Sequence, residues 1–168
     1  MITLTLILTF GLCLCFNPVY NNYTSLLNSS YAFFYYLWIF FMVISFFKKT
    51  VCFINNQKEK RFLIILGCLF IIGSYLPYQS PFIVTSYLHV FLPTICMMMY
   101  FIYLFYKISL FQKKEPIKAH LLFQCYFWGL SLISMLIVFF GHINGIIEIA
   151  ILIYIIFMIN KMYIICDS

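Results

Sequence analysis

Six long apolar stretches account for most of this 168-residue chain. Each has about the length that an α-helix needs to cross the ~30 Å hydrocarbon core of a bilayer, which is roughly 17–25 residues. They cover residues 2–20, 31–47, 62–78, 82–106, 120–140 and 144–164. A soluble domain could not bury them all, because 65% of the residues are apolar and only 8% are charged. The sequence therefore predicts a helical integral membrane protein whose first partner is the lipid bilayer.

The first stretch, residues 2–20, is the weakest of the six. Its continuous apolar run ends at Phe16, before Asn17 and Pro18. A cleaved signal peptide would begin with a basic segment and end in small residues at its cleavage site, and this stretch has neither. We therefore expect a retained helix. A five-span protein without residues 1–16 is the alternative.

The basic residues sort the loops into two kinds. All ten lie at the end of, or after, the second, fourth and sixth stretches: Lys48, Lys49, Lys58, Lys60, Arg61, Lys107, Lys113, Lys114, Lys118 and Lys161. The loops after the first, third and fifth stretches contain none. Because Lys and Arg in short loops are retained on the cytoplasmic side of a membrane, we expect the basic loops and both termini in the cytoplasm.

The loops after the third and fifth stretches are very short, so the helices that they join should pack as antiparallel neighbours. The sequence thus predicts an all-α integral membrane protein, a six-transmembrane-helix bundle of three antiparallel hairpins. No loop is long enough to fold alone, and residues 1–168 are expected to form a single transmembrane domain. The short loops favour a multi-pass protein of a bacterial cell membrane.

The net charge of +6 comes from these topology residues and does not indicate nucleic acid as a partner, since no aromatic residues alternate with them. The seven cysteines show no CxxC spacing, and most lie in apolar runs, where a free cysteine packs as a small hydrophobe. They predict neither a disulfide framework nor a metal site. The residues identify no cofactor.

Glu148 is the most unusual residue of the last stretch, because it lies among isoleucines in the run "GHINGIIEIA". An acidic side chain is costly near the bilayer centre and less so toward the interface. A helix that begins at Asn144 would place Glu148 about 6 Å below the boundary. Asn144 lies one turn earlier on the same face, so it is expected to hold the carboxylate. Two interpretations remain open: a structural tie between helices and a functional group.

The fourth stretch carries a polar stripe. Its members recur at steps of three and four residues: Ser86, His89, Pro93, Cys96, Tyr100, Tyr103 and Lys107. This spacing places them on one helix face, which is expected to contact other helices rather than lipid. His89 is then either a hydrogen-bonded packing residue or part of a site.

These residues lie at similar depths in the predicted topology. If the third, fourth and sixth helices meet, six side chains converge on an outward-facing polar pocket: Glu148, His89, Asn144, His142, Tyr75 and Tyr78. We expect a ligand-binding site there. For the tyrosines, an interfacial aromatic belt is the alternative.

Three classes of function follow. The first is a protein that binds a small or lipid-like ligand, or another membrane subunit, through this pocket. The second is a membrane enzyme that uses His89, His142 and Glu148, with or without a metal ion. The third is an accessory subunit in which the polar residues only join helices. The sequence lacks HExxH, GxSxG and P-loop motifs, so binding is preferred to catalysis.

Six helices with both termini in the cytoplasm is an arrangement similar to that of the substrate-binding subunits of energy-coupling transporters. The likeness is one of helix number and topology, and it implies a transport-related or accessory role.

Overall fold

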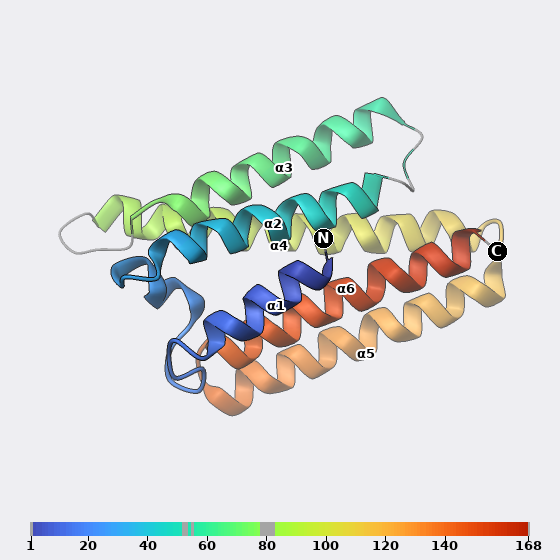
Figure 1. The fold of residues 1–168 in the computed structure, drawn as a ribbon. Coiled ribbons are helices and arrows are strands. Elements are labelled where there is room, and N and C mark those ends of the chain that lie inside the picture. Colours follow the sequence, from blue (N-terminus) through green and yellow to red (C-terminus); the bar gives the residue numbers. More distant parts are fainter. Residues whose placement is uncertain (1, 52–53, 55, 78–82, 168) are drawn as a thin grey trace.

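The computed structural model describes residues 2–51, 54, 56–77 and 83–167, and within them the chain is entirely helical (Figure 1). The elements are α1 (Ile2–Cys13), the 3-10 helix η1 (Tyr23–Asn28), α2 (Ala32–Val51), α3 (Gln57–Tyr75), α4 (Ile83–Gln112), α5 (Pro116–Phe140) and α6 (Gly145–Asp167). No strand occurs in these residues. The all-α class predicted from the apolar stretches is confirmed.

Four of the described helices are long and apolar enough to cross a membrane. They are Ala32–Val51, Val84–Gln112, Pro116–Phe140 and Gly145–Ile165. Four such helices indicate a multi-pass membrane protein. Helix α3 does not qualify, because its first turns carry four charged residues, from Lys58 to Arg61. Helix α1 does not qualify because it is too short.

The first helix ends earlier than expected, at Cys13 rather than near residue 20. At 1.5 Å per residue its 12 residues extend about 18 Å, well short of the ~30 Å hydrocarbon core. The chain then turns, and the Asn17 side chain accepts a hydrogen bond from the Val19 backbone N–H at 3.1 Å. Asn17 and Pro18 favour this turn over a continued helix, because Asn competes for backbone hydrogen bonds and Pro donates none.

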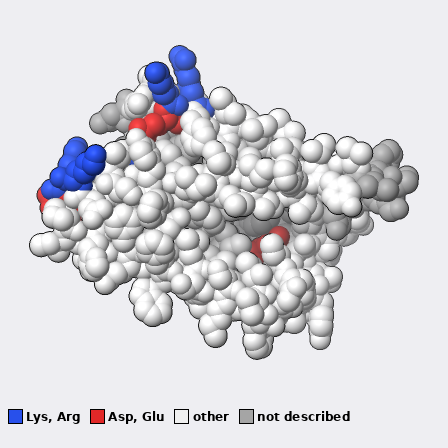
Figure 2. Space-filling view, turned by 180° about the vertical axis from the view of Figure 1, so that it is seen from behind, with Lys and Arg blue, Asp and Glu red and all other residues white. Residues whose placement is uncertain are grey.

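The helices lie side by side along one axis, and consecutive helices contact one another from α1–α2 through α5–α6 (Figure 1). Helix α2 also contacts α6. Residues 48–51, 56–61 and 107–118 and the C-terminal part of α6, which includes Lys161, lie at one end of the bundle, called here the basic end. Residues 14–31 and 141–144 lie at the other, called here the far end. Figure 2 shows basic side chains only toward one end of the visible face.

At the basic end, hydrogen bonds join helices that are distant in sequence. Glu59 of α3 accepts from Lys107 Nζ and from the Tyr103 hydroxyl of α4, both at 3.0 Å. Lys107–Glu59 is the one salt bridge in the described part of the chain. Lys49 of α2 donates to the Asn160 side chain of α6.

Helix α4 packs against α3 along much of its length, from Lys107 at the basic end to Pro93. It also contacts α5, where the Tyr126 hydroxyl donates to the Phe101 carbonyl at 3.0 Å. Among the predicted stripe residues, His89, Cys96 and Tyr103 are buried. The expectation that this face of α4 contacts protein is therefore confirmed.

The α3–α4 contact depends on a glycine. A Cβ atom added at Gly73 would lie 2.7 Å from both Leu92 Cβ and Pro93 Cδ, which belong to the rigid part of α4. We expect Gly73→Ala to destabilise the protein by about 1–3 kcal/mol, because the two helices would have to separate. Thermal unfolding of the purified protein measures this effect.

Gly11→Ala is the matched control, since a Cβ at Gly11 would meet nothing within 4 Å. Equal unfolding temperatures for the two variants would contradict the close approach of α3 and α4.

Candidate functional site

A cavity of about 250 Å³ lies toward the far end, between α2, α3, α4 and α6. His89 of α4 and Glu148 of α6 both line it. Tyr23 and Thr24 of η1 contribute to its wall, together with aromatic residues of α2. The structure thus brings two of the six predicted site residues to one cavity.

Glu148 lies in the first turn of α6 and is half-buried. Its Oε2 accepts a hydrogen bond from the Tyr23 backbone N–H at 2.7 Å. Among the described residues its Oε1 has no hydrogen-bond partner, and the carboxylate forms no ion pair with them. Figure 2 shows an acidic side chain at the floor of a hollow in the side of the bundle, away from the basic residues. One carboxylate oxygen therefore supports the fold, and the other is available to a ligand.

His89 has a defined position as well as a place in the cavity wall. Its Nδ1 donates to the Leu76 carbonyl at 2.9 Å, because a carbonyl can only accept. Leu76 caps the C-terminus of α3, where backbone carbonyls lack partners within the helix. The hydrogen bond fixes the imidazole ring between α3 and α4, and the side chain is buried.

Asn144 does not hold Glu148, contrary to the sequence-based expectation. Its Oδ1 accepts from the Ile147 N–H at 3.1 Å, and its Nδ2 donates to the Val19 carbonyl at 2.9 Å. Asn144 is therefore an N-cap of α6. The physical reason is that the first N–H groups of a helix need acceptors outside it.

The segment between α1 and α2, residues 14–31 and called here the strap, supplies further acceptors to α6. The Gly145 N–H donates to the Asn21 carbonyl at 2.8 Å, and the Ile146 N–H donates to the Pro18 carbonyl at 3.3 Å. Since lipid offers no hydrogen bonds, these contacts complete the start of α6. The strap covers the far end of the cavity.

Tyr23 is the strap residue that sequence reasoning missed. Its ring stacks on Trp38 of α2, with centroids 4.5 Å apart, and its hydroxyl donates to the Thr9 carbonyl of α1 at 2.6 Å. Trp38 Nε1 donates to Thr9 Oγ1 at 2.8 Å. Burial raises the pKa of the Tyr23 hydroxyl above its ordinary value, so it remains a donor at physiological pH. The sequence held one signal for this contact: Thr5 and Thr9 are two polar residues one turn apart on an otherwise apolar helix.

The remaining predicted site residues lie elsewhere. His142 is exposed, and its Nδ1 donates to the Phe140 carbonyl at 2.9 Å. The Tyr75 hydroxyl donates to the Tyr36 carbonyl at 2.8 Å, and Tyr75 does not line the cavity. Tyr78 lies outside the described residues. No group of three His, Cys, Asp or Glu side chains in the described part of the chain could hold a metal ion.

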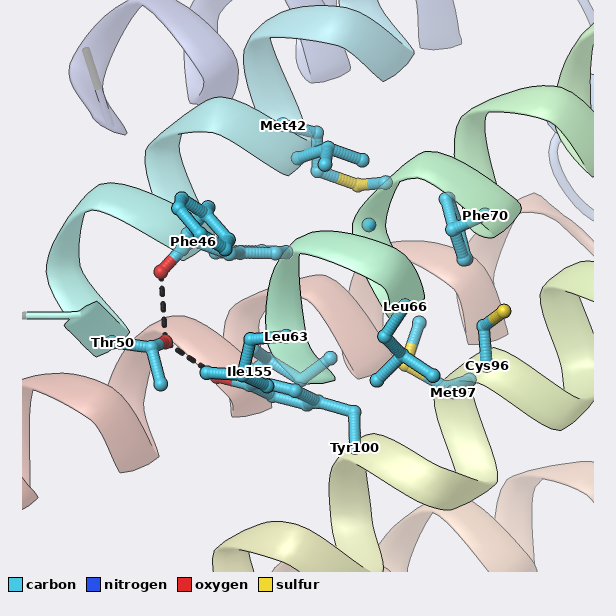
Figure 3. Close-up of a pocket in the computed structure, with 13 residues that line it drawn as sticks. Met42, Phe46, Thr50, Leu63, Leu66, Phe70, Cys96, Met97, Tyr100 and Ile155 are labelled. Atoms are coloured by element: carbon cyan, nitrogen blue, oxygen red, sulfur yellow. Dashed lines mark hydrogen bonds between the residues drawn. The ribbon is translucent and has the colours of Figure 1, made fainter. Parts of the chain in front are cut away.

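A second cavity of about 70 Å³ continues from the first toward the basic end (Figure 3). The two cavities share five lining residues: Met42, Phe46, Phe70, Met97 and Ile155. Its walls are almost wholly apolar. At its end Thr50 donates to the Phe46 carbonyl at 2.8 Å, so the Tyr100 hydroxyl, 2.9 Å away, donates to Thr50 (Figure 3). The bundle interior thus holds a mostly apolar cavity with a few polar groups and, next to it, a smaller and almost wholly apolar cavity, called here the apolar extension.

Comparison of the chain with protein-family models, with curated proteins and with solved structures found no match. The function has to be inferred from the cavity itself.

The strap contacts lead to a prediction about stability. Asn144→Ala removes both hydrogen bonds of the N-cap, and we expect it to lower the free energy of unfolding by about 1–3 kcal/mol. Thermal unfolding measures the loss, and limited proteolysis should cut residues 14–31 faster than in the original protein.

His142→Ala changes an exposed side chain two residues away and should alter stability by less than about 0.5 kcal/mol. An Asn144→Ala variant as stable as His142→Ala would contradict the capping role.

Proposed function

We propose that this chain is an integral membrane protein that binds a small or lipid-like ligand in the cavity between α2, α3, α4 and α6. The observation that carries the proposal is the Glu148 carboxylate, which lines the cavity and has one oxygen, Oε1, without a hydrogen-bond partner among the described residues. A half-buried carboxylate has lost part of its hydration, so a polar or cationic partner stabilises it. A bound ligand would supply one.

The cavity has features of a binding site. Its volume of about 250 Å³ is just below the roughly 300–1,000 Å³ of small-molecule pockets, which are mostly apolar with a few polar groups. Its polar groups are held by the fold, since Glu148 accepts from Tyr23 and His89 donates to Leu76. Such preorganisation lowers the entropic cost of binding. Catalysis by His89, Glu148 and His142 together is less well supported, because His142 is not in the cavity wall.

The proposal includes an orientation in the membrane. The basic end faces the cytoplasm, and the cavity faces outward. The N-terminal end of α1 and the C-terminal end of α6 therefore both point toward the cytoplasm. All six α-helices are embedded, but α1 covers only the part of the bilayer near the far end. Basic residues around α3 extend beyond the hydrocarbon, as long cationic side chains do at helix ends.

Reporter fusions test this orientation. Alkaline phosphatase, which is active only outside the cytoplasm, should be inactive when fused after Ser168 and active when inserted after His142. The two fusions differ only in position, so each is a control for the other. Activity after Ser168 would overturn the proposed orientation.

Native mass spectrometry of the protein, purified in nanodiscs with its own membrane lipids, tests ligand binding. We expect a small-molecule adduct on the original protein and a loss of most of it in Glu148→Gln. This variant keeps an oxygen acceptor for the Tyr23 N–H but deletes the charge. Glu115→Gln, which changes an exposed carboxylate at the start of α5, should keep the adduct. Equal adducts in both variants, or none on any form, would refute the proposal.

A further inference from the structure

We infer that the ligand is a single-chain amphiphile with a cationic ammonium head, which lies at Glu148 while its alkyl tail extends between α2, α3 and α4. This inference rests on the proposed function and names the chemical class of its ligand. Three observations carry it: the surroundings of Glu148, the charge of the far end, and the shape of the two cavities.

The surroundings of Glu148 suit an ammonium group. Three of the aromatic side chains that line the cavity belong to η1 and the first half of α2: Tyr23, Tyr35 and Trp38. Trp38 stacks on Tyr23 with centroids 4.5 Å apart, so each ring covers one face of the other, and the Trp38 centroid is 5.9 Å from that of Tyr35. Aromatic faces attract cations, and the ring faces that remain uncovered can do so here. The carboxylate adds a charge-assisted hydrogen-bond acceptor at Oε1.

The charge distribution of the chain favours a cation over an anion in this cavity. No Lys or Arg lines the cavity. All ten Lys and Arg residues belong to the segments of the basic end, on the opposite side of the bundle. An anionic head at Glu148 would meet a like charge without compensation, which disfavours binding.

The apolar extension suits an alkyl tail. From Trp38 to Thr50, helix α2 advances 12 residues, or about 18 Å, along the two cavities. This length is close to the ~15 Å of hydrocarbon in one leaflet of a bilayer. The second cavity is small, at about 70 Å³, which favours one chain over two. Its shared wall contains Met42 and Met97, whose flexible side chains can adjust to an inserted chain.

The position of the cavity mouth gives such a ligand access from lipid. Figure 2 shows the hollow in the side of the bundle rather than at its end. Two exposed apolar residues border the cavity, Val90 of α4 and Ile143 before α6. An amphiphile dissolved in the membrane can therefore reach Glu148 without passing through the strap.

Tryptophan fluorescence provides the test, because Trp38 lines the cavity and is only 6% exposed. The exposed Trp128 is first removed by Trp128→Phe, which leaves Trp38 as the single reporter. The protein in phosphatidylcholine nanodiscs is titrated with 3-bromo-undecylammonium, whose bromine is near the head and quenches tryptophan on contact. The matched probe is 3-bromo-undecanoate, which has the same tail length and bromine position but an anionic head. A third probe, 3-bromo-propylammonium, keeps the head and bromine position and shortens the tail.

We expect saturable quenching by the long ammonium probe and only linear, partition-driven quenching by the carboxylate probe. Glu148→Gln should lower the affinity for the long ammonium probe by roughly 30-fold, the loss typical of removing one partner of a desolvated charge pair. Glu115→Gln should leave its affinity unchanged. The short ammonium probe should bind more weakly than the long one. Circular dichroism and thermal unfolding verify that each variant is folded.

The outcomes separate this inference from the function on which it rests. Equal saturable binding of both long probes, or unchanged binding in Glu148→Gln, would refute the preference for a cationic head, while the proposal of a ligand-binding cavity would stand. Equal binding of the long and short ammonium probes would refute the contribution of the alkyl tail to binding. No saturable quenching by any probe, with an adduct still seen by native mass spectrometry, would overturn the amphiphile alone. Failure of both measurements would refute the proposed function as well.

Discussion

The N-terminus of a helix in a membrane leaves backbone N–H groups that lipid cannot satisfy, and the far end of this protein is arranged around that requirement. Helix α6 begins at Gly145, and its first donors bond to carbonyls of the strap and to the Asn144 side chain. In return, Glu148 accepts from the Tyr23 backbone. These reciprocal contacts hold the strap in place. Through the Tyr23 ring and hydroxyl they also fix α1 and α2, and with them one wall of the cavity.

This arrangement gives Glu148 two roles that a mutation to a nonpolar residue would not separate. Oε2 accepts the hydrogen bond from the strap, and the Glu148 side chain also lines the cavity. A carboxylate at this position also interacts favourably with the positive end of the α6 dipole. The fold therefore offsets part of the cost of placing an acidic group among apolar side chains.

The sequence predicted those features that depend on local composition. The apolar stretches gave the helical class and most helix positions, and the cost of polar groups in lipid singled out His89 and Glu148. The structure places both around one cavity. The role of Asn144 and the importance of Tyr23 were not predicted, because both involve hydrogen bonds between segments 125 residues apart, Asn144–Val19 and Glu148–Tyr23. No local periodicity encodes such contacts. The early end of α1 has a local cause in Asn17 and Pro18, and the sequence marked this stretch only as the weakest of the six. The number of membrane crossings remains a prediction.

The separation of 125 residues between Tyr23 and Glu148 also has a consequence for biosynthesis. A chain made from its N-terminus inserts α1, the strap and α2 long before α6 exists. Until the last helix is in place, the strap has no partner for its carbonyls of Pro18, Val19 and Asn21. The cavity is therefore completed last, when α6 supplies the wall that contains Glu148. A truncated chain lacking α6 would leave these strap carbonyls without the donors that Asn144 and the start of α6 give them.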